Sequence, residues 1–389
     1  MLPLALLSLA IWLYLLSARG GYWMFRERLG GAQFPLPLGR GQGEGALPSV
    51  VAVVPARDEA DSIAQAIGGL LRQDYRGSFR VILVDDQSTD GTAQIARNTA
   101  AALGAEARLE IMSGKDRPKG WVGKLWAMNQ GVARAMSGEE PDYFLFTDAD
   151  IEHPPDNVTR LVAHAAGRGT VLTSLMVRLR CESFAEKLLI PAFVYFFSML
   201  FPFAWSNDPR NKVAAAAGGC MLVKRAPFLA AGGLETIKSA IIDDCALARM
   251  MKKQGPIWLG LSHETLSLRP YEGLSDIGRM VWRSAYAQLG YSPMALAGTV
   301  IGMLLVYCVP AASAIFAHGP AQITGTLTWF VMALTFVPIS RFYGTSTMRG
   351  VLLPVIGLIY TGFTLVSAVN FWTGRGGMWK GRAQAMASS

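Results

Sequence analysis

Three acidic clusters, each at the end of an apolar run, constrain this chain more than any other feature of its sequence. They are Asp85–Asp86 after Val81–Val84, Asp148–Asp150 after Tyr143–Thr147, and Asp243–Asp244 after Ile241–Ile242. Carboxylates are costly in apolar surroundings unless they are paired, hydrogen-bonded or bound to a cation. One such pair could be a turn or a helix cap, but three in one chain predict an active site.

The first half of the chain alternates between predicted strands and predicted helices. Strands are expected at 49–54, 79–84, 108–112 and 143–147, and helices at 59–71, 90–103 and 125–136. This alternation is typical of βαβ units and predicts an α/β fold with a mainly parallel sheet. The carboxyl ends of parallel strands share one edge, where open α/β sheets bind ligands. The first two acidic clusters are expected at that edge.

The composition indicates a soluble-type domain attached to a bilayer. Hydrophobic residues make up 51% of the chain and charged residues 16%, and the mean hydropathy is +0.30; these values are too apolar for an ordinary soluble enzyme. The net charge of +8 fits a protein that lies against an anionic membrane surface. A nucleic-acid partner is disfavoured because no run of Lys and Arg alternates with aromatic residues. The four Cys and four His lack metal-ligand spacing, which disfavours a zinc site.

Apolar segments at both ends predict membrane attachment. Residues 1–16 are apolar and precede Arg19 and Arg26, which fits an uncleaved anchor followed by a cytoplasmic segment. The apolar run 188–205 is expected to lie in the membrane interface or to form a buried helix pair. Three further membrane spans are expected at 294–317, 323–339 and 351–371.

These segments divide the chain into four predicted parts. They are an N-terminal anchor (1–29), a linker rich in Gly and Pro (30–47), a catalytic domain (48–290), and a C-terminal transmembrane region with a tail (291–389). Four spans would place both termini opposite the catalytic domain, whereas the basic tail favours the cytoplasmic side. We expect the catalytic domain to face the cytoplasm and leave the number of spans open.

Residues 53–59 and 84–92 resemble the opening of glycosyltransferase family 2, whose members have the GT-A fold. The resemblance implies that these segments cradle the nucleoside of a nucleotide-sugar donor, since carboxylates accept hydrogen bonds from a base N–H or from ribose hydroxyls. Glu59 could equally be a solvated residue in the first turn of a helix. The implied donor-binding residues are Pro55, Arg57, Glu59, Asp85 and Asp86.

Two further segments resemble the donor-phosphate site of the same family. Residues 123–131 match its Gly–Lys segment, in which Lys124 at a helix start would neutralise a diphosphate; a solvated surface lysine is the alternative. Asp148 and Asp150 match its DxD motif, and alternation along an extended chain directs both carboxylates to one side. These carboxylate oxygens, together with phosphate oxygens of the donor, suit Mg²⁺ or Mn²⁺. Asp148 would therefore also lie close to the bound donor.

The second half of the chain resembles the catalytic part of the family. Asp243 and Asp244 match its catalytic pair, in which Asp244 is the general base and Asp243 supports it. Gly218 and Gly219 match a Gly–Gly segment near the acceptor, where glycine lets the backbone approach a sugar. A tight turn before a strand is the alternative for the two glycines.

Arg279 and Arg283 match imperfectly a Gln/Arg-x-x-Arg-Trp motif of membrane-bound relatives, because Trp282 precedes Arg283. By this resemblance they would lie on the acceptor side and contact the diphosphate leaving group. Basic and aromatic residues on a helix at the level of the lipid headgroups would show the same pattern, and this alternative stays open.

Longer stretches resemble one branch of the family, the hopene-associated glycosyltransferases of bacterial hopanoid biosynthesis. They are 120–127, 147–153, 174–181, 190–193, 214–221 and 242–248. The branch implies a membrane enzyme of sterol-like lipid metabolism and leaves the acceptor open.

Together these features predict an inverting, metal-dependent glycosyltransferase of the bacterial inner membrane. It would be a multi-pass protein whose cytoplasmic domain moves a sugar from a nucleotide donor, expected to be a UDP-sugar, to a lipid acceptor. One alternative is a processive polysaccharide synthase, which would need more membrane helices and a well-formed Gln/Arg-x-x-Arg-Trp motif. The other is a non-catalytic membrane scaffold, which would gain nothing from holding three carboxylate clusters together.

Overall fold

The computed structural model describes residues 1–30 and 47–374, together with the short strands β9 (Met378–Trp379) and β10 (Arg382–Ala383). The chain divides into two compact units. The α/β unit contains mainly Glu27–Leu179 and Trp205–Arg269, and the helical unit contains Met1–Arg26, Arg180–Ala204 and Pro270–Met378. Most of the predicted linker, 31–46, lies outside the described residues.

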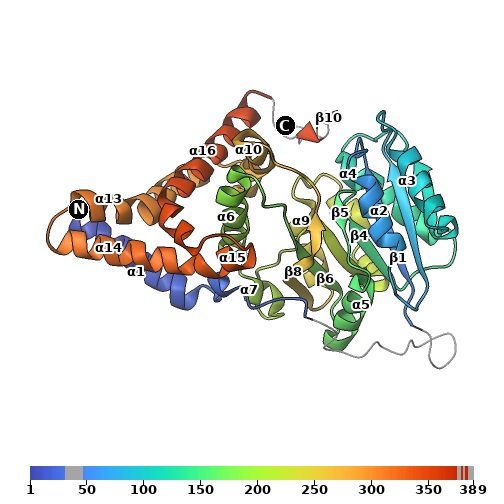
Figure 1. The fold of residues 1–389 in the computed structure, drawn as a ribbon, viewed down its shortest axis with the longest axis horizontal. Helices are drawn as coiled ribbons and strands as arrows, with labels where there is room; N and C mark the ends of the chain where they lie inside the picture. The colour runs from blue at the N-terminus through green and yellow to red at the C-terminus, as the bar shows by residue number, and fades with distance from the viewer. Residues whose placement is uncertain (31–46, 375–377, 380–381, 384–389) are drawn as a thin grey trace. The chain divides into compact units, whose positions relative to one another are not determined.

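An eight-stranded sheet with the order β3-β2-β1-β4-β7-β6-β8-β5 forms the α/β unit (Figure 1). Its first four strands are parallel, with Val50 opposite both Phe79 and Tyr143. Strand β7 runs antiparallel between β4 and β6. The predicted α/β fold with a mainly parallel sheet is confirmed. The strands are β1 (Val50–Ala56), β2 (Phe79–Asp85), β3 (Leu109–Ser113), β4 (Tyr143–Thr147), β5 (Ile151–Glu152), β6 (Leu172–Arg178), β7 (Cys220–Lys224) and β8 (Ile257–Ser267).

The helices of this unit cover both faces of the sheet. They are α2 (Ile63–Leu71), α3 (Thr92–Ala102), α4 (Gly123–Met136), α5 (Asn157–Arg168), α8 (Arg225–Ala230) and α9 (Asp243–Lys252), with the 3₁₀ turns η2 (Glu106–Arg108) and η3 (Gly233–Ile237). Helix α2 begins at Ile63, later than predicted. Before it, Glu59 N donates to Thr92 Oγ1 and Ala60 N to Asp90 Oδ2, each at 2.9 Å. The start of α3 therefore holds these residues outside the helix.

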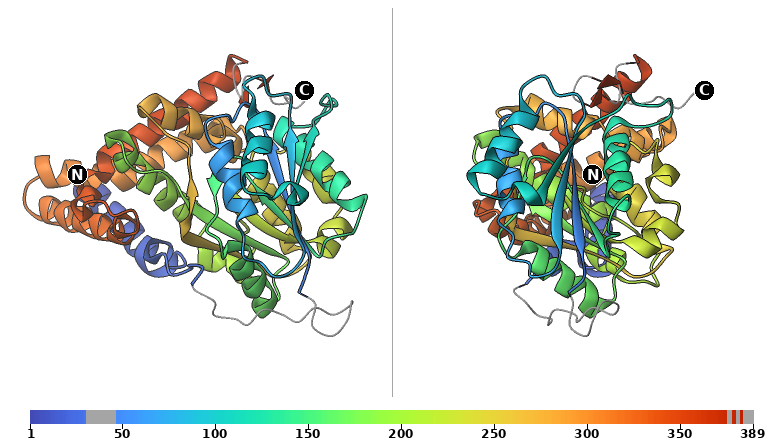
Figure 2. Two further views of the ribbon diagram at one scale, coloured as in Figure 1. Left: turned by 45° about the vertical axis from the view of Figure 1, so that its right-hand side comes forward. Right: turned by 90° about the vertical axis from the view of Figure 1, so that its right-hand side faces the viewer.

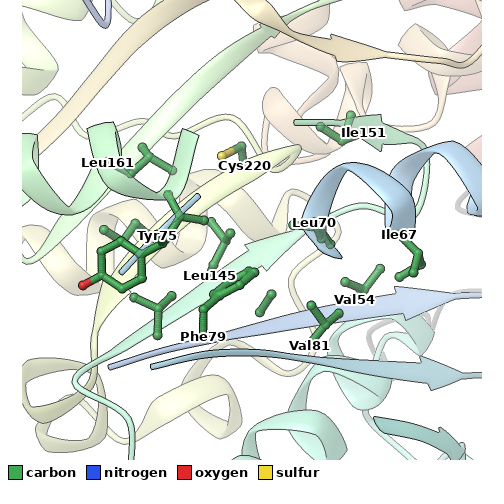
Figure 3. Close-up of a cluster of buried hydrophobic side chains, with 14 of the residues drawn as sticks. Val54, Ile67, Leu70, Tyr75, Phe79, Val81, Leu145, Ile151, Leu161 and Cys220 are labelled. Carbon is green, nitrogen blue, oxygen red and sulfur yellow. The ribbon is translucent and has the colours of Figure 1, made fainter. Parts of the chain in front are cut away.

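Alternation along the strands creates two buried layers. Val54, Val81 and Leu145 face α2, where Ile67 and Leu70 pack against them (Figure 3). The intervening strand residues face α4 and α9 on the opposite side, and the right-hand view of Figure 2 shows helices on both sides of the strands.

The helical unit contains the apolar segments at both ends of the chain. Three of its helical stretches, Pro293–Phe316, Pro320–Phe342 and Thr347–Trp372, are long and apolar enough to cross a membrane, and they match the three predicted C-terminal spans. The N-terminal helix Leu2–Ala18 is apolar but shorter, and it lies beside α13 and α14 (Figure 1). The helices are α1 (Leu2–Ala18), α6 (Phe184–Leu200), α10 (Leu274–Trp282), α11 (Ala285–Gln288), α12 (Pro293–Met303), α13 (Val309–Phe316), α14 (Pro320–Thr335), α15 (Val337–Phe342) and α16 (Leu353–Trp372), with η1 (Tyr22–Met24), the π-helical turn η4 (Leu304–Cys308) and η5 (Thr347–Leu352).

Helix α6 covers most of the apolar run predicted at 188–205, and the short α7 (Phe203–Asn207) follows it. Leu189, Ile190 and Tyr195 are fully buried, and α6 has its neighbours in η1, α10, α15 and α16. The grouping of 180–204 and 270–290 with the membrane-type helices differs from the predicted boundary at 290. The physical reason is that the apolar surface of α6 packs on these helices.

Two prolines inside apolar helices leave carbonyls that distant side chains satisfy. Pro310 has no N–H for the carbonyl four residues earlier, and Trp12 Nε1 donates to that atom, Val306 O, at 2.8 Å. Pro191 in α6 likewise cannot serve Lys187 O, to which Arg349 Nη1 donates at 2.9 Å. Both contacts tie together helices that are far apart in the sequence.

The end of α16 lies beside the segment that precedes α12. Tyr286 N donates to Ser367 Oγ at 3.0 Å, and the rings of Tyr291 and Phe371 stack with centroids 4.3 Å apart. Helix α12 therefore starts at the level where α16 ends.

Candidate active site

The α/β unit brings all three acidic clusters toward the carboxyl edge of its sheet. Asp85 is the last residue of β2, and Asp148 directly follows β4. Asp243 and Asp244 begin α9, a position that suits carboxylates because a helix N-terminus carries partial positive charge. The shared edge was predicted for the first two clusters, and the structure adds the third.

Lys124 joins two of these clusters. Its Nζ lies 2.7 Å from Asp148 Oδ1 and 3.3 Å from Asp243 Oδ2. It is the second residue of α4, whose start is fixed by a hydrogen bond from Val122 N to Lys238 O at 2.8 Å. Burial alone would lower the pKa of the Lys124 ammonium, but the carboxylates of Asp148 and Asp243 raise it well above its usual range. Lys124 is thus a permanent cation between the DxD motif and the predicted catalytic pair, not a solvated lysine.

Asp150, the second carboxylate of the DxD motif, lies in an anionic environment. Burial, then Asp148 and Glu59, raise its pKa to about 6, against the opposing charges of Arg269 and Lys124. A divalent cation would relieve this penalty, so the donor set of Asp148 and Asp150 fits the predicted metal. Within the described residues no group of three or more Asp, Glu, His or Cys is placed to hold a metal. Phosphate oxygens or water would therefore have to complete the coordination.

Asp244 is held rigidly and is a strong candidate for the base. Its Oδ2 accepts from Gly218 N at 3.0 Å and its Oδ1 from Cys245 N at 2.6 Å. Burial, then Asp243, raise the pKa of Asp244 to about 6, against the opposing charge of Lys124. A carboxylate with a pKa near 6 is ionised at neutral pH and more basic than a solvated one.

Gly218 lies between the cation and this carboxylate. A Cβ at that position would be 3.4 Å from Lys124 Nζ and 3.5 Å from Asp244 Oδ2. A methyl group would thus be in ordinary van der Waals contact with both charged groups, which places the Gly218 backbone directly beside them. At Gly219, a Cβ would meet Val177 and Ile151 at 3.2 and 3.3 Å, so this glycine serves packing as well.

The predicted nucleoside residues cluster at the ends of β1 and β2. Arg57 Nη1 donates to Asp86 O at 2.6 Å and lies 3.6 Å from Asp86 Oδ2, and Asp86 is 2% exposed. Asp85 is less buried, and its Oδ1 accepts from Ser88 N at 3.1 Å. Pro55 pairs with Val84 in the sheet. Asp85 is thus the better placed of the two for a ligand, while Asp86 and Arg57 shape the loop.

His153 is a supporting residue that the sequence did not indicate. It is buried, which lowers its pKa to about 3 and keeps it neutral. The amide nitrogen of Asn157 lies 2.8 Å from Nδ1 and can only donate, so Nε2 carries the proton and donates to Thr147 Oγ1 at 2.8 Å. Thr147 in turn donates to Gly219 O at 2.8 Å. This chain fixes the strand end before Asp148 against the glycine turn.

Arg279 and Arg283 belong to the helical unit, on and just after α10, and both are exposed. Arg279 pairs with Asp276 one turn earlier. The described residues show α10 as an amphipathic helix that buries Ile277 and Val281. Both the leaving-group role and the headgroup role predicted for the two arginines remain predictions.

Residues 51–230 match the family model of Glycosyl transferase family 2. The 4,4'-diaponeurosporenoate glycosyltransferase of Staphylococcus haemolyticus is 28% identical over 137 residues, 35% of this chain and 32% of that protein. The undecaprenyl-phosphate 4-deoxy-4-formamido-L-arabinose transferase of Aeromonas hydrophila is 30% identical over 144 residues, 36% and 40% of the two chains. The chain therefore matches only about a third of the length of these curated relatives.

Among solved structures, the mannosyltransferase PcManGT from Pyrobaculum calidifontis, in complex with GDP-Man and Mn²⁺, has a similar fold. The TM-score is 0.51 at 18% identity, with 94% of this chain and 99% of that chain covered. At this identity the likeness concerns the fold alone, and it confirms the GT-A architecture expected for the α/β unit.

Proposed function

We propose that this chain is a member of glycosyl transferase family 2, whose family model matches residues 51–230, and that it transfers a sugar from a nucleotide-sugar donor to a lipid acceptor at a membrane. The observation that carries the proposal is the contact of Lys124 with both Asp148 and Asp243. This contact brings Asp148, which we assign to the donor phosphates, close to Asp243 and the neighbouring candidate base at one sheet edge. An inverting transfer needs the donor and the base at one place.

In this proposal the residues of β1 and β2 bind the nucleoside, and Asp148 and Asp150 hold Mg²⁺ or Mn²⁺. When bound, the cation would neutralise the charge that develops on the diphosphate as the leaving group departs. Asp244 removes the proton from the acceptor hydroxyl, whose oxygen attacks the anomeric carbon from the face opposite the diphosphate. The bond from that carbon to the diphosphate breaks, and inversion follows from this single displacement. Asp243 supports Asp244 and keeps Lys124 in place.

The helical unit and the relatives support the proposed acceptor and location. Helices long enough to span a bilayer support an inner-membrane, multi-pass protein. One relative is named a 4,4'-diaponeurosporenoate glycosyltransferase and another an undecaprenyl-phosphate 4-deoxy-4-formamido-L-arabinose transferase, and these names support a lipid acceptor. The resemblance to hopene-associated glycosyltransferases supports a hopanoid-type lipid, and we propose a UDP-sugar as donor.

The pairing of the end of α16 with the segment before α12 bears on the orientation. Because these two chain positions lie at one level, we propose that the end of α16 is on the same side of the membrane as the start of α12, so that the chain between them crosses the membrane an even number of times.

The test uses membranes that contain the full chain and labelled nucleotide sugars, with product measured in the lipid extract. We expect labelled lipid that disappears on chelation, and loss of donor binding in Asp150→Ala when Mn²⁺ is present. Asp156→Ala is the matched control, since this aspartate is half exposed and lies just before α5, outside the site. Donor binding that is equal with and without chelator would reject the metal site. Absence of both donor binding and labelled lipid would favour a scaffold.

A further inference from the structure

Lys124 occupies a position that a metal-dependent transferase would need to clear. Its ammonium is 2.7 Å from Asp148 Oδ1, the carboxylate that we assign to the cation. Its side chain is only 17% exposed, and it also reaches Asp243 Oδ2 at 3.3 Å. A single protein cation therefore holds a carboxylate from the strand end after β4 to one from the start of α9.

A divalent cation and this ammonium cannot both approach Asp148 without strong repulsion. Two like charges a few ångströms apart repel by several kcal/mol near a protein surface. The nearby backbone also restricts where the ammonium can go, because Gly218 packs against it on one side. Two groups that attract cations lie within reach: Asp243, and the diphosphate of a bound donor.

We propose that Lys124 is a positioning residue that competes with the divalent cation for Asp148 until the donor diphosphate attracts its ammonium. This inference rests on the proposed function, since it takes Asp148 as a metal ligand. In the donor-free protein Lys124 holds the place of the cation and keeps the acidic edge compact. When metal and donor arrive together, the ammonium leaves Asp148 for the diphosphate while it stays near Asp243.

Such competition makes metal and donor binding depend on each other. The metal alone must displace the Lys124 ammonium from Asp148 and therefore binds weakly. When the donor is present, its diphosphate attracts the ammonium, so the metal binds without having to displace it. By thermodynamic linkage, the donor tightens the metal by the same factor as the metal tightens the donor. A lysine that served only to neutralise phosphate would strengthen donor binding but would not weaken metal binding in the absence of donor.

The experiment measures Mn²⁺ affinity of the detergent-solubilised full chain by the EPR signal of free Mn²⁺, with and without UDP or GDP. In Lys124→Met we expect Mn²⁺ alone to bind about tenfold tighter than in the parent. We expect the tightening of Mn²⁺ by nucleotide to shrink by a similar factor, within the usual range of coupling. Lys212→Met is the matched control, because Lys212 is an exposed lysine of the same unit that is not placed in the site.

Lys124→Arg keeps the charge, so Mn²⁺ alone should bind as weakly as in the parent if competition by a cation is the cause. This variant also covers the case in which Lys124→Met fails to fold. Unchanged Mn²⁺ affinity in a folded Lys124→Met, or tightened affinity in Lys124→Arg, would overturn the inference and leave the proposed function standing. A parent protein that binds neither Mn²⁺ nor nucleotide would reject the proposed function itself.

Discussion

The two units of this protein bury different kinds of polar group. In the α/β unit, carboxylates and an ammonium meet at the sheet edge, where Lys124 and Asp244 are among the most enclosed charges. In the helical unit the stretch 293–340 contains no Asp, Glu, Lys or Arg, and the buried polar side chains of this stretch carry hydroxyls. Outside it, the buried carboxylate of Glu186 accepts from the backbone N–H groups of Glu182 and Ser183 at the start of α6. Charges need compensation that a sheet edge can offer, whereas a helix in lipid must satisfy its polar groups internally.

The comparison teaches where each unit is vulnerable. The α/β unit depends on the balance of charges around Lys124, so removing one charge should reduce its activity. The helical unit depends on close packing and on side-chain donors to the carbonyls that prolines leave unpaired, so changes in side-chain size or loss of such a donor should lower its stability. The predictions below test this contrast.

The largest effect is expected for Asp244→Asn in the α/β unit. Asn keeps the size of Asp and one of the two acceptor oxygens that bind Gly218 N and Cys245 N, but it cannot take a proton at neutral pH. If Asp244 is the base, turnover should fall by about a hundredfold or more while donor affinity stays nearly intact. Product formation from labelled donor and nucleotide-sugar calorimetry measure the two quantities.

Asp243→Asn is the matched neighbour, and we expect a milder loss of turnover because its role is support. The assignment of the base fails if Asp244→Asn keeps full turnover, or if the two variants exchange their effects.

Two glycines compare the packing of the units directly. A Cβ on Gly131 in α4 would overlap Val53 Cγ1, a side-chain atom, whereas on Gly325 in α14 it would lie 2.8 Å from both Ala314 N and Pro310 O. Ala gains about 1 kcal/mol of helix propensity over Gly, and overpacking costs about 1–3 kcal/mol. Gly325→Ala should therefore lower the free energy of unfolding by up to about 2 kcal/mol and Gly131→Ala by less, because backbone atoms cannot rotate away from the added methyl group.

Thermal unfolding in one detergent compares these variants. Gly302→Ala in α12 is the control, since a Cβ at this position would have no atom within 4 Å, and it should be neutral or stabilising. A larger loss at Gly131 than at Gly325 would contradict the view that close backbone packing limits the helical unit.

The pH dependence of turnover should report the buried carboxylate. Burial, then Asp243, raise the pKa of Asp244 to about 6, against the opposing charge of Lys124. The base is active only when ionised, so at saturating donor the turnover should be constant above pH 7 and fall about tenfold by pH 5. A profile that stays flat down to pH 5 would mean that Asp244 titrates lower or is not the base.

The same shift has the opposite sign for stability. A carboxylate whose pKa is higher in the folded than in the unfolded state stabilises the fold when protonated, and this contribution is lost as the pH rises through about 6. The contribution of Asp244 to stability should therefore decrease between about pH 4 and pH 6, the ordinary and the raised pKa of this carboxyl, and stay constant above that range.

Elements that depend on neighbouring residues could be predicted from the sequence, whereas contacts between residues far apart in the sequence could not. The strands and helices of 49–147 could be predicted because apolar alternation and caps are local signals, and β4 has the predicted bounds. The contact of Lys124 with Asp243, 119 positions later, could not, because it depends on how α9 returns to the sheet edge. His153 gave no signal either, since a lone histidine after a DxD motif shows nothing of Thr147 and Asn157 around it. The start of α2 was misjudged because α3 binds the preceding N–H groups.

The smallest effect is expected for the hydrogen bond from Trp12 Nε1 to Val306 O. Trp12→Phe keeps a ring beside Tyr307, whose centroid is 5.8 Å away, but removes the N–H. The Val306 carbonyl, which Pro310 cannot serve, then has lost its side-chain donor. Hydrogen bonds between membrane helices contribute about 0.6–2 kcal/mol, so we expect the free energy of unfolding to fall by about 1 kcal/mol. Donor affinity should not change, because the site residues lie in the α/β unit.

Pro310→Ala supplies the control, since it restores an N–H for Val306 O. In that background Trp12→Phe should cost almost nothing, and an equal cost in both backgrounds would assign the loss to packing instead.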